Sequence, residues 1–451
     1  MSQPRRFRVG GWLPHDLGRI DLWIRDLKKR VDANPRPLIK PIREFQEMVY
    51  QDPVLHHNIF KMFQEAAARK KETPLGTPEI RSFEEFLALL NQIMWEAPEY
   101  TECEDKGKEE PCGLIGFPIN ALLNWPMGTD TGYDVFSNSL VNQALKKILA
   151  HWSTFLVTEE SRYVLVENHP DRTPKVLAWL NPIALQEMVN VACQGQGDSK
   201  SCTDQKFEQI FKCDPADPYY GFKSWDHFFT RTFVKGVRPV ASPDDDNVIV
   251  NACESGPLQK VEGVNESDTF WLKNMPYSLM NMMDFDPLAS EFKNGTVYQA
   301  FLSALSYHRW HSPVAGTIKK AFVVNGTYYL ENRYEGFIDP EGADPSAPNG
   351  SQPFLSSVAT RAVIFIEADN PKIGLMCFVA IGMAEVSSCE ITVSQGQHVP
   401  KGDQLGMFHF GGSTHCLVFR EDVTLEWDFH GLTPNINATN IPVRSRIATV
   451  I

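Results

Sequence analysis

Residues 391–410 read ITVSQGQHVPKGDQLGMFHF. In this stretch apolar residues such as Val399 and Leu405 alternate with polar ones, which is the period of a half-buried β-strand. Gly396 and Gly402 interrupt the alternation, and glycines at such short intervals favour tight turns between strands. The segment therefore predicts short strands joined as hairpins.

These hairpins are similar to those of the barrel-sandwich domains that carry lipoyl or biotinyl groups. Such a carrier needs a lysine at a hairpin tip, within the tripeptide D-K-A or M-K-M, and neither tripeptide occurs in the sequence. The similarity therefore concerns the fold and excludes a carrier function.

Strand-and-turn composition continues on both sides of this stretch, from about residue 245 onward. Residues 312–329 read SPVAGTIKKAFVVNGTYY, with a turn expected at Asn325-Gly326. Residues 373–384 (IGLMCFVAIGMA) are the longest apolar run. This run is shorter than the roughly 18–20 residues of a membrane-spanning helix, so we expect a buried strand.

The first half of the chain carries apolar residues at three- and four-residue spacing, which predicts amphipathic helices. The predicted helices are Ile42–Val49, Ile59–Ala68, Phe83–Trp95 and Leu140–Trp152. The expected fold class is α+β, with a mainly helical N-terminal region over residues 1–220 and a β-rich domain over residues 221–451.

The composition bears on localisation and partners. The chain has 451 residues and a formal net charge of −13, so it lacks the excess of cations that nucleic-acid binding requires. The acidic balance also argues against residence on an anionic membrane surface. Nothing at the N-terminus has the apolar core of a secretion signal. We expect a soluble, cytoplasmic protein with no membrane span and no nucleic-acid partner.

Nine cysteines occur without a C-x-x-C pair, which argues against a zinc ribbon or a thioredoxin-like site. Cys103 with Cys112, and Cys193 with Cys202, flank polar loops and could form disulfides in an oxidising compartment. In a reducing compartment we expect free thiols.

Gly411-Gly412-Ser413-Thr414 offers a candidate nucleophile beside an unobstructed carbonyl. Paired glycines permit backbone angles that other residues resist. Attack of the Ser413 oxygen on the Gly412 carbonyl would replace the peptide bond with an ester. Elimination would then cut the chain and leave dehydroalanine, and hydrolysis with loss of ammonia would leave a pyruvoyl group at residue 413. The tetrapeptide by itself is much more typical of an ordinary turn.

Residues 307–313 read YHRWHSP and contain two histidines, His308 and His311. The two side chains share a face if the segment is helical and lie on opposite faces if it is extended. One imidazole could act as a general base and the other as an acid in a later step. No acidic or cysteine partner is near in sequence, so no metal is expected.

Three motifs occur in a fixed order: FFTR at residues 228–231 with Arg238-Pro239, then YHRWHSP at 307–313, then GGST at 411–414. Together they resemble the motifs of the phosphatidylserine decarboxylase family, over roughly residues 220–451. The N-terminal motifs Gly11-Trp12-Leu13 and Asp52-Pro53-Val54 are similar to those of the soluble fungal members of that family. The latter similarity implies a free amino acid as substrate rather than a lipid.

The resemblance also implies roles for individual residues. Ser413 would become the pyruvoyl group, His311 would activate Ser413 during self-cleavage, and His308 would assist decarboxylation. The family's cleavage triad includes an Asp in a P-A-D-G-like segment, where this sequence has NACES at 251–255. Glu254 is the nearest equivalent, and a longer carboxylate could still orient His311.

The resemblance implies a self-processing decarboxylase, cut between Gly412 and Ser413 into two fragments that stay associated. The pyruvoyl group would serve as an electron sink in place of pyridoxal phosphate, whose S-x-H-K site is missing. The leading substrate is tryptophan or a related aromatic amino acid. The alternatives are a phosphatidylserine decarboxylase, a serine hydrolase that uses Ser413, His311 and Glu254, and a non-catalytic scaffold.

Overall fold

The fold is described from a computed structural model of the chain. It describes residues 12–14, 17–69, 80–101, 116–194, 202–267, 277–332, 350–385 and 388–451. Contacts divide the chain into two units. The first unit comprises Met1–Ala184, Phe222–His227 and Thr327–Ser351, and the second comprises Leu185–Gly221, Phe228–Gly326 and Gln352–Ile451. This division differs from the single boundary predicted at residue 220, because Leu185–Gly221 belongs to the β-rich unit and two later segments belong to the helical one.

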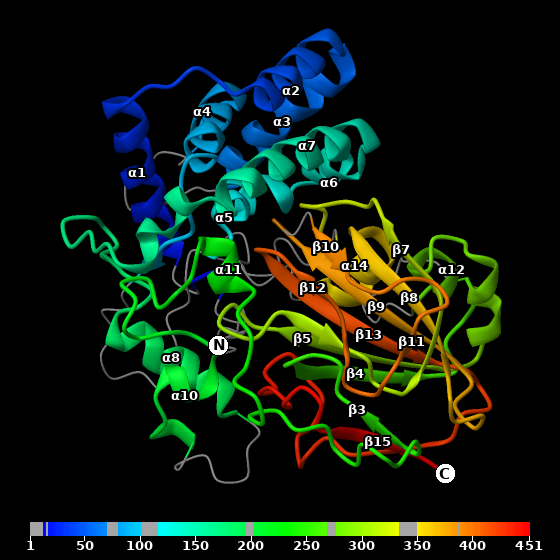
Figure 1. The fold of residues 1–451 in the computed structure, drawn as a ribbon. Coiled ribbons are helices and arrows are strands. Elements are labelled where there is room, and N and C mark those ends of the chain that lie inside the picture. The colour runs from blue at the N-terminus through cyan, green and yellow to red at the C-terminus, as the bar shows by residue number, and fades with distance from the viewer. Residues whose placement is uncertain are drawn as a thin grey trace, which may run out of the picture. The chain divides into compact units, whose positions relative to one another are not determined.

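The first unit is mainly helical (Figure 1). Ile42, Phe45 and Val49 form the buried face of α2, and the Ser82 side chain caps α4 by accepting a hydrogen bond from the Glu85 amide. Its helices are α1 (Leu17–Ala33), α2 (Lys40–Gln51), α3 (Pro53–Arg69), α4 (Phe83–Ile93), α5 (Pro118–Met127), α6 (Asp130–Ser137), α7 (Ser139–Leu156) and the 3₁₀ helix η1 (Glu159–Leu165). The short strands β1 (Tyr100–Thr101) and β2 (Val176–Leu177) pair with each other.

The second unit is built on a seven-stranded antiparallel sheet, whose strands follow the order β11-β7-β8-β9-β13-β5-β4. These strands are β4 (Gly256–Glu262), β5 (Thr296–Leu302), β7 (Gly316–Val324), β8 (Arg361–Ala368), β9 (Leu375–Met383), β11 (His398–Val399) and β13 (Gly412–Phe419). Figure 1 shows β5, β13 and β9 side by side, so β13 has a hydrogen-bonded neighbour on each edge.

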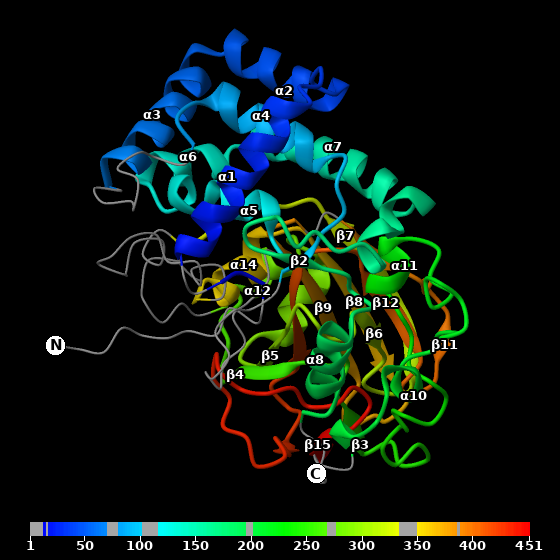
Figure 2. The same ribbon diagram turned by 90° about the vertical axis from the view of Figure 1, so that its left-hand side faces the viewer.

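Two smaller sheets complete this unit. One sheet has the order β10-β12-β6 and consists of β10 (Cys389–Ile391), β12 (Gln404–Phe408) and β6 (Arg309–His311). The other has the order β14-β15-β3 and consists of β14 (Leu425–Trp427), β15 (Arg446–Val450) and β3 (Val248–Val250). Figure 2 shows α14 (Gln352–Val358) and α12 (Leu279–Met282) beside the large sheet, and α14 contacts both β9 and β13. The unit also contains η2 (Pro287–Phe292), α10 (Phe207–Ile210) and most of α8 (Pro182–Ala192), while α11 (Trp225–Phe229) is divided between the two units.

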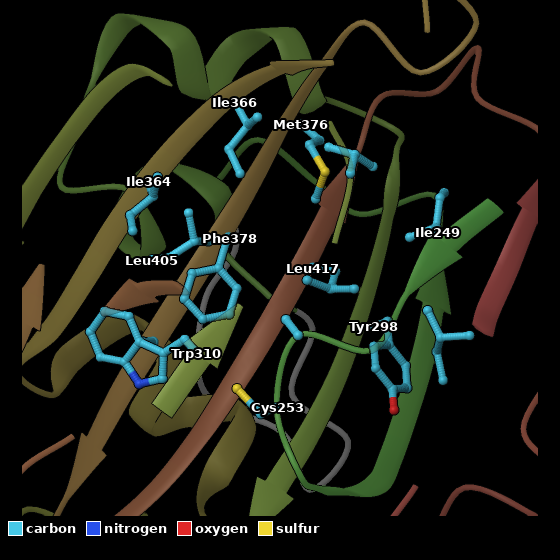
Figure 3. Close-up of a cluster of buried hydrophobic side chains, with 14 of the residues drawn as sticks. Ile249, Cys253, Tyr298, Trp310, Ile364, Ile366, Met376, Phe378, Leu405 and Leu417 are labelled. Atoms are coloured by element: carbon cyan, nitrogen blue, oxygen red, sulfur yellow. The ribbon is translucent and has the colours of Figure 1, made fainter. Parts of the chain in front are cut away.

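The core of the second unit lies between these sheets (Figure 3). It gathers Tyr298 from β5, Trp310 from β6, Phe378 from β9 and Leu417 from β13, all of which are fully buried. Burial of each such side chain stabilises the fold by roughly 1.5–3 kcal/mol, which explains why the strands around β13 are almost entirely apolar.

The predicted elements are confirmed where the structure describes them. The four predicted helices correspond to α2, α3, α4 and α7, and residues 373–384 contain β9. Residues 391–410 form short strands, with turns at Gly396 (φ 83°) and Gly402 (φ 84°). At Gly402 a Cβ atom would also lie 2.5 Å from the Val240 side chain, so this turn requires glycine.

Cys193 and Cys202 form a disulfide. Cys103 and Cys112 lie outside the described residues, as does most of the proline-rich stretch at 340–353. None of the helices in the described part of the chain has the length and apolar character that a bilayer span requires.

Candidate active site

Ser413 is the second residue of β13, where it lies opposite Leu302 of β5 and Gly382 of β9. The side chain is 1% exposed, and its hydroxyl has no hydrogen-bond partner among the described residues. Gly411, just before the strand, has a φ of 133°, an angle that only glycine adopts without strain. The Gly412–Ser413 bond therefore begins a central, doubly paired strand directly after a glycine-specific bend.

His308 is fully buried and stacks against Phe229, with ring centroids 4.0 Å apart. Phe229 in turn meets the ring of Phe410 edge-on at 5.5 Å, three residues before Ser413. Burial lowers the pKa of His308 well below its usual range, and the nearby charge of Arg231 acts in the same direction. His308 is therefore a neutral imidazole at physiological pH, connected to the Gly411 bend through two aromatic rings.

His311 lies at the end of β6, and the extended backbone directs its side chain away from the core that Trp310 enters. The Tyr307 hydroxyl lies 2.9 Å from Nε2 of His311, and the carbonyl oxygen of Gly402 lies 2.9 Å from Nδ1. Burial, together with the charge of Arg444, whose Nη2 is 3.1 Å from Nδ1, lowers the pKa of His311 to about 3. His311 is thus a neutral imidazole with both ring nitrogens engaged.

Glu254 is 1% exposed and forms a buried ion pair with Arg238. One of its oxygens also accepts a hydrogen bond from the Val443 amide at 2.8 Å. Arg444, the residue after Val443, has its Nη2 3.1 Å from Nδ1 of His311, so the Glu254 contact and the His311 contact come from adjacent residues. Among the described residues no hydrogen bond joins Glu254 to His311 directly.

The structure therefore gathers the predicted residues into two groups. Glu254 and His311 form one group, because they contact the adjacent residues Val443 and Arg444, while His308 stacks on Phe229, whose ring meets that of Phe410. No hydrogen bond between Ser413 and either histidine is found in the described part of the chain.

Three residues in these groups have roles that sequence reasoning did not assign. Arg444, Tyr307 and Phe229 hold the two histidines. Tyr307 lies in the YHRWHSP motif and Phe229 in the FFTR motif, so the sequence already marked both positions as candidates. Arg444 follows no motif and is separated by 133 residues from the ring it contacts.

The donor set fits a prosthetic group made from the chain itself. A buried serine hydroxyl without a partner, next to a glycine carbonyl at a bend, is the arrangement that serine attack on the backbone requires. Within the described ranges, no group of three or more His, Cys, Asp or Glu side chains is placed to hold a metal ion. The buried serine hydroxyl and the neutral imidazoles can support acyl transfer and proton transfer.

Models of known protein families match both halves of the chain. Models described as phosphatidylserine decarboxylase match residues 39–188 and residues 225–434. The second match contains Glu254, both histidines and Ser413.

Two fungal decarboxylases are similar over most of their length. The L-tryptophan decarboxylase of Psilocybe cubensis is 35% identical over 432 residues, which cover 94% of this chain and 91% of that protein. The decarboxylase iboD of Amanita muscaria is 41% identical over 356 residues, or 75% of this chain and 95% of that protein.

Phosphatidylserine decarboxylase proenzyme 3 of Schizosaccharomyces pombe is 30% identical over 207 residues, only 20% of its length.

Proposed function

This chain belongs to the phosphatidylserine decarboxylase family, and from that premise we propose that it converts a free L-amino acid to its amine and CO2 with a pyruvoyl group made from Ser413. The leading substrate is tryptophan or a related aromatic amino acid. The observation that carries the proposal is the buried, unpartnered hydroxyl of Ser413 beside the Gly412 carbonyl, among the residues that the structure describes.

Self-cleavage needs only groups of the chain and water. The Ser413 oxygen adds to the Gly412 carbonyl carbon, and the peptide bond between the two residues is replaced by an ester. Elimination across the Cα–Cβ bond of Ser413 releases residues 1–412 with a free carboxylate. Water then displaces ammonia from the new N-terminus. The pyruvoyl group that results would supply an electron sink for the decarboxylation.

The histidines hold and move protons in this scheme. We assign to His311 the removal of the hydroxyl proton, because its imidazole is neutral at physiological pH. If the hydrogen bond between the Tyr307 hydroxyl and Nε2 of His311 opens, Nε2 becomes available to accept that proton. We assign to His308 the proton that the substrate Cα receives, since it lies behind Phe229 close to the Gly411 bend. Glu254 would act on His311 through the adjacent residues Val443 and Arg444.

Two observations favour a free amino acid. The similarity to the named L-tryptophan decarboxylase extends over 91% of that protein, whereas the phosphatidylserine decarboxylase proenzyme is matched over 20% of its length. In addition, the stack of Phe229 on His308 gives this side of the site an aromatic character, which suits an aromatic side chain. The cytoplasmic location expected from the sequence accords with a free substrate.

Phosphatidylserine is the second candidate substrate, because both family models carry its name. A serine hydrolase is not favoured, since the two relatives matched over most of their length are named decarboxylases and Ser413 does not lie in a G-x-S-x-G motif.

Release of CO2 from carboxyl-labelled substrates separates these candidates. Purified protein would be given tryptophan, phenylalanine, tyrosine and leucine in parallel, together with phosphatidylserine in detergent micelles. The proposal predicts that tryptophan or another aromatic amino acid releases CO2 fastest. Release from phosphatidylserine alone would contradict the proposed substrate class while leaving the pyruvoyl chemistry intact.

A further inference from the structure

A third buried imidazole lies on the strand that begins at the proposed cleavage site. His415 is two residues beyond Ser413 in β13 and is fully buried. Neither of its ring nitrogens has a hydrogen-bond partner among the residues that the structure describes. A buried polar group without a partner is destabilising, so its presence calls for an explanation in function.

Ser413 and His415 point to the same face of the sheet, because side chains two residues apart in a strand share a face. Their Cα atoms are roughly 6.6 Å apart in an extended strand. Rotation of the two side chains, or one bridging water, joins a hydroxyl and an imidazole over that separation. Ser413 and His415 are the two residues of this face whose polar atoms are both buried and unpartnered in the described part of β13.

Three of the four residues opposite this pair on the neighbouring strands are small, and the fourth is Leu302, which lies opposite Ser413. Ala300 and Ala380 flank His415, and Gly382 lies beside Ser413. A methyl group is the largest side chain at these three positions, so they add little bulk beside the imidazole. The same positions on a purely structural strand would favour larger apolar side chains, as Phe378 and Tyr298 do opposite Leu417.

The surroundings of His415 keep its imidazole neutral. Its ring packs against Phe378 and Tyr298, with centroids 5.9 Å and 6.2 Å away, and Trp310 lies next to Phe378 (Figure 3). Burial among these rings lowers the pKa of His415 to about 3. One ring nitrogen of His415 therefore carries a lone pair over the whole physiological pH range and can accept a hydrogen bond.

We propose that His415 accepts a hydrogen bond from the Ser413 hydroxyl in the uncut chain and so holds the oxygen for attack on the Gly412 carbonyl. This inference rests on the proposed function. In the step that it assists, the Ser413 oxygen bonds to the carbonyl carbon and the bond from that carbon to the Ser413 nitrogen breaks. The hydroxyl proton passes to that nitrogen by way of His311, so no other reactant is needed. His415 acts beside His311, whose ring nitrogens are engaged by Tyr307 and Gly402.

The proposed role is specific to a group that exists only before cleavage. Once Ser413 has become a pyruvoyl group, its hydroxyl oxygen is gone, and the hydrogen bond with His415 can no longer form. Loss of the imidazole should therefore slow cutting by a larger factor than it slows turnover per cut chain. A packing role for His415 would instead affect both rates and the thermal stability together.

The test compares three variants synthesised in a cell-free system, with the uncut chain followed by gel electrophoresis after a labelling pulse. His415→Phe keeps the ring volume but has no hydrogen-bonding atom, and His415→Asn retains a polar atom near the position of Nδ1. Cys416→Ala is the matched control, because Cys416 is equally buried but points to the opposite face of β13. Melting temperatures show whether each variant folds.

We expect His415→Phe to cut about 10- to 100-fold more slowly than the unmodified chain, the effect of one lost positioning hydrogen bond. His415→Asn should recover part of that rate, and Cys416→Ala should cut at the unmodified rate. A folded His415→Phe chain that cuts at the unmodified rate would overturn the inference alone. Equal slowing of cutting and turnover in both His415 variants would also overturn it, in favour of packing. Failure of the unmodified chain to cut would overturn the proposed function itself.

Discussion

Arg238 binds both carboxylate oxygens of Glu254, with Nε 3.0 Å from Oε2 and Nη2 2.5 Å from Oε1. The two side chains are 3% and 1% exposed. Water therefore cannot compensate either charge if the other is removed, and the pair fixes the carboxylate that also binds the Val443 amide.

Arg238→Ala should lower the free energy of unfolding by about 3–5 kcal/mol, because it leaves the Glu254 charge buried and unpaired. Urea unfolding measures this loss. The matched control is Arg446→Ala, whose pair with Asp428 is half-exposed and should contribute less than about 1 kcal/mol. Losses of similar size in the two variants would show that burial does not govern the strength of the Arg238 pair.

Glu254→Gln should slow self-cleavage by about tenfold, equivalent to roughly 1.4 kcal/mol in the barrier. The effect is modest because, among the described residues, no hydrogen bond joins Glu254 directly to His311. Pulse-labelled chain followed on gels gives the rate, with Glu262→Gln as a surface control. Normal cutting by Glu254→Gln would mean that its charge plays no part in the reaction.

Substitution of each histidine in the YHRWHSP segment should affect a different reaction, either self-cleavage or decarboxylation. His311→Ala should leave the chain mostly uncut, whereas His308→Ala should cut and then release CO2 about 10²–10⁴-fold more slowly than the unmodified enzyme. The extent of cutting on denaturing gels and CO2 release per cut chain are the two readouts. The assignment is wrong if His308→Ala blocks cutting and His311→Ala does not.

Acid should destabilise the protein through its buried imidazoles. Burial lowers the pKa values of His311 and His415 to about 3, against about 6.5 in the unfolded chain. Between these values the unfolded chain binds protons that the folded chain does not. The free energy of unfolding therefore falls as the pH falls through this window, by up to about 1.4 kcal/mol per pH unit for each ring.

The variant His415→Phe isolates one of these contributions. Urea unfolding at about pH 7 and about pH 5.5 should show a loss of stability roughly 1 kcal/mol smaller in His415→Phe than in the unmodified protein. Equal losses in the two proteins would mean that His415 is protonated in the folded state.

The sequence predicts elements whose signal is local. The spacing of Ile42, Phe45 and Val49 identifies α2, and the alternation around Gly396 and Gly402 identifies the short strands, because both patterns depend on neighbours within a few residues. The expected hairpins do not form, because β11 pairs with β7 whereas β10 and β12 belong to another sheet. The motifs also point to the segments that carry Ser413 and the two histidines.

The partners of those residues could not be predicted, because they come from distant parts of the chain. Val443 is 189 residues from the Glu254 carboxylate that it binds, and Arg444 is 133 residues from His311. His415 follows the cleavage motif, but its significance depends on the small residues that β5 and β9 place beside it. Only the register of three strands reveals that arrangement.

The intact mass of the purified protein under denaturing conditions tests the central claim most directly, with Ser413→Ala as the control. The account predicts two fragments, 1–412 and 413–451, the smaller one lighter by the mass of ammonia than a fragment that begins with serine. Ser413→Ala should give a single mass for the whole chain. A single uncut chain from the unmodified protein, or efficient cutting of Ser413→Ala at the same bond, would contradict the account.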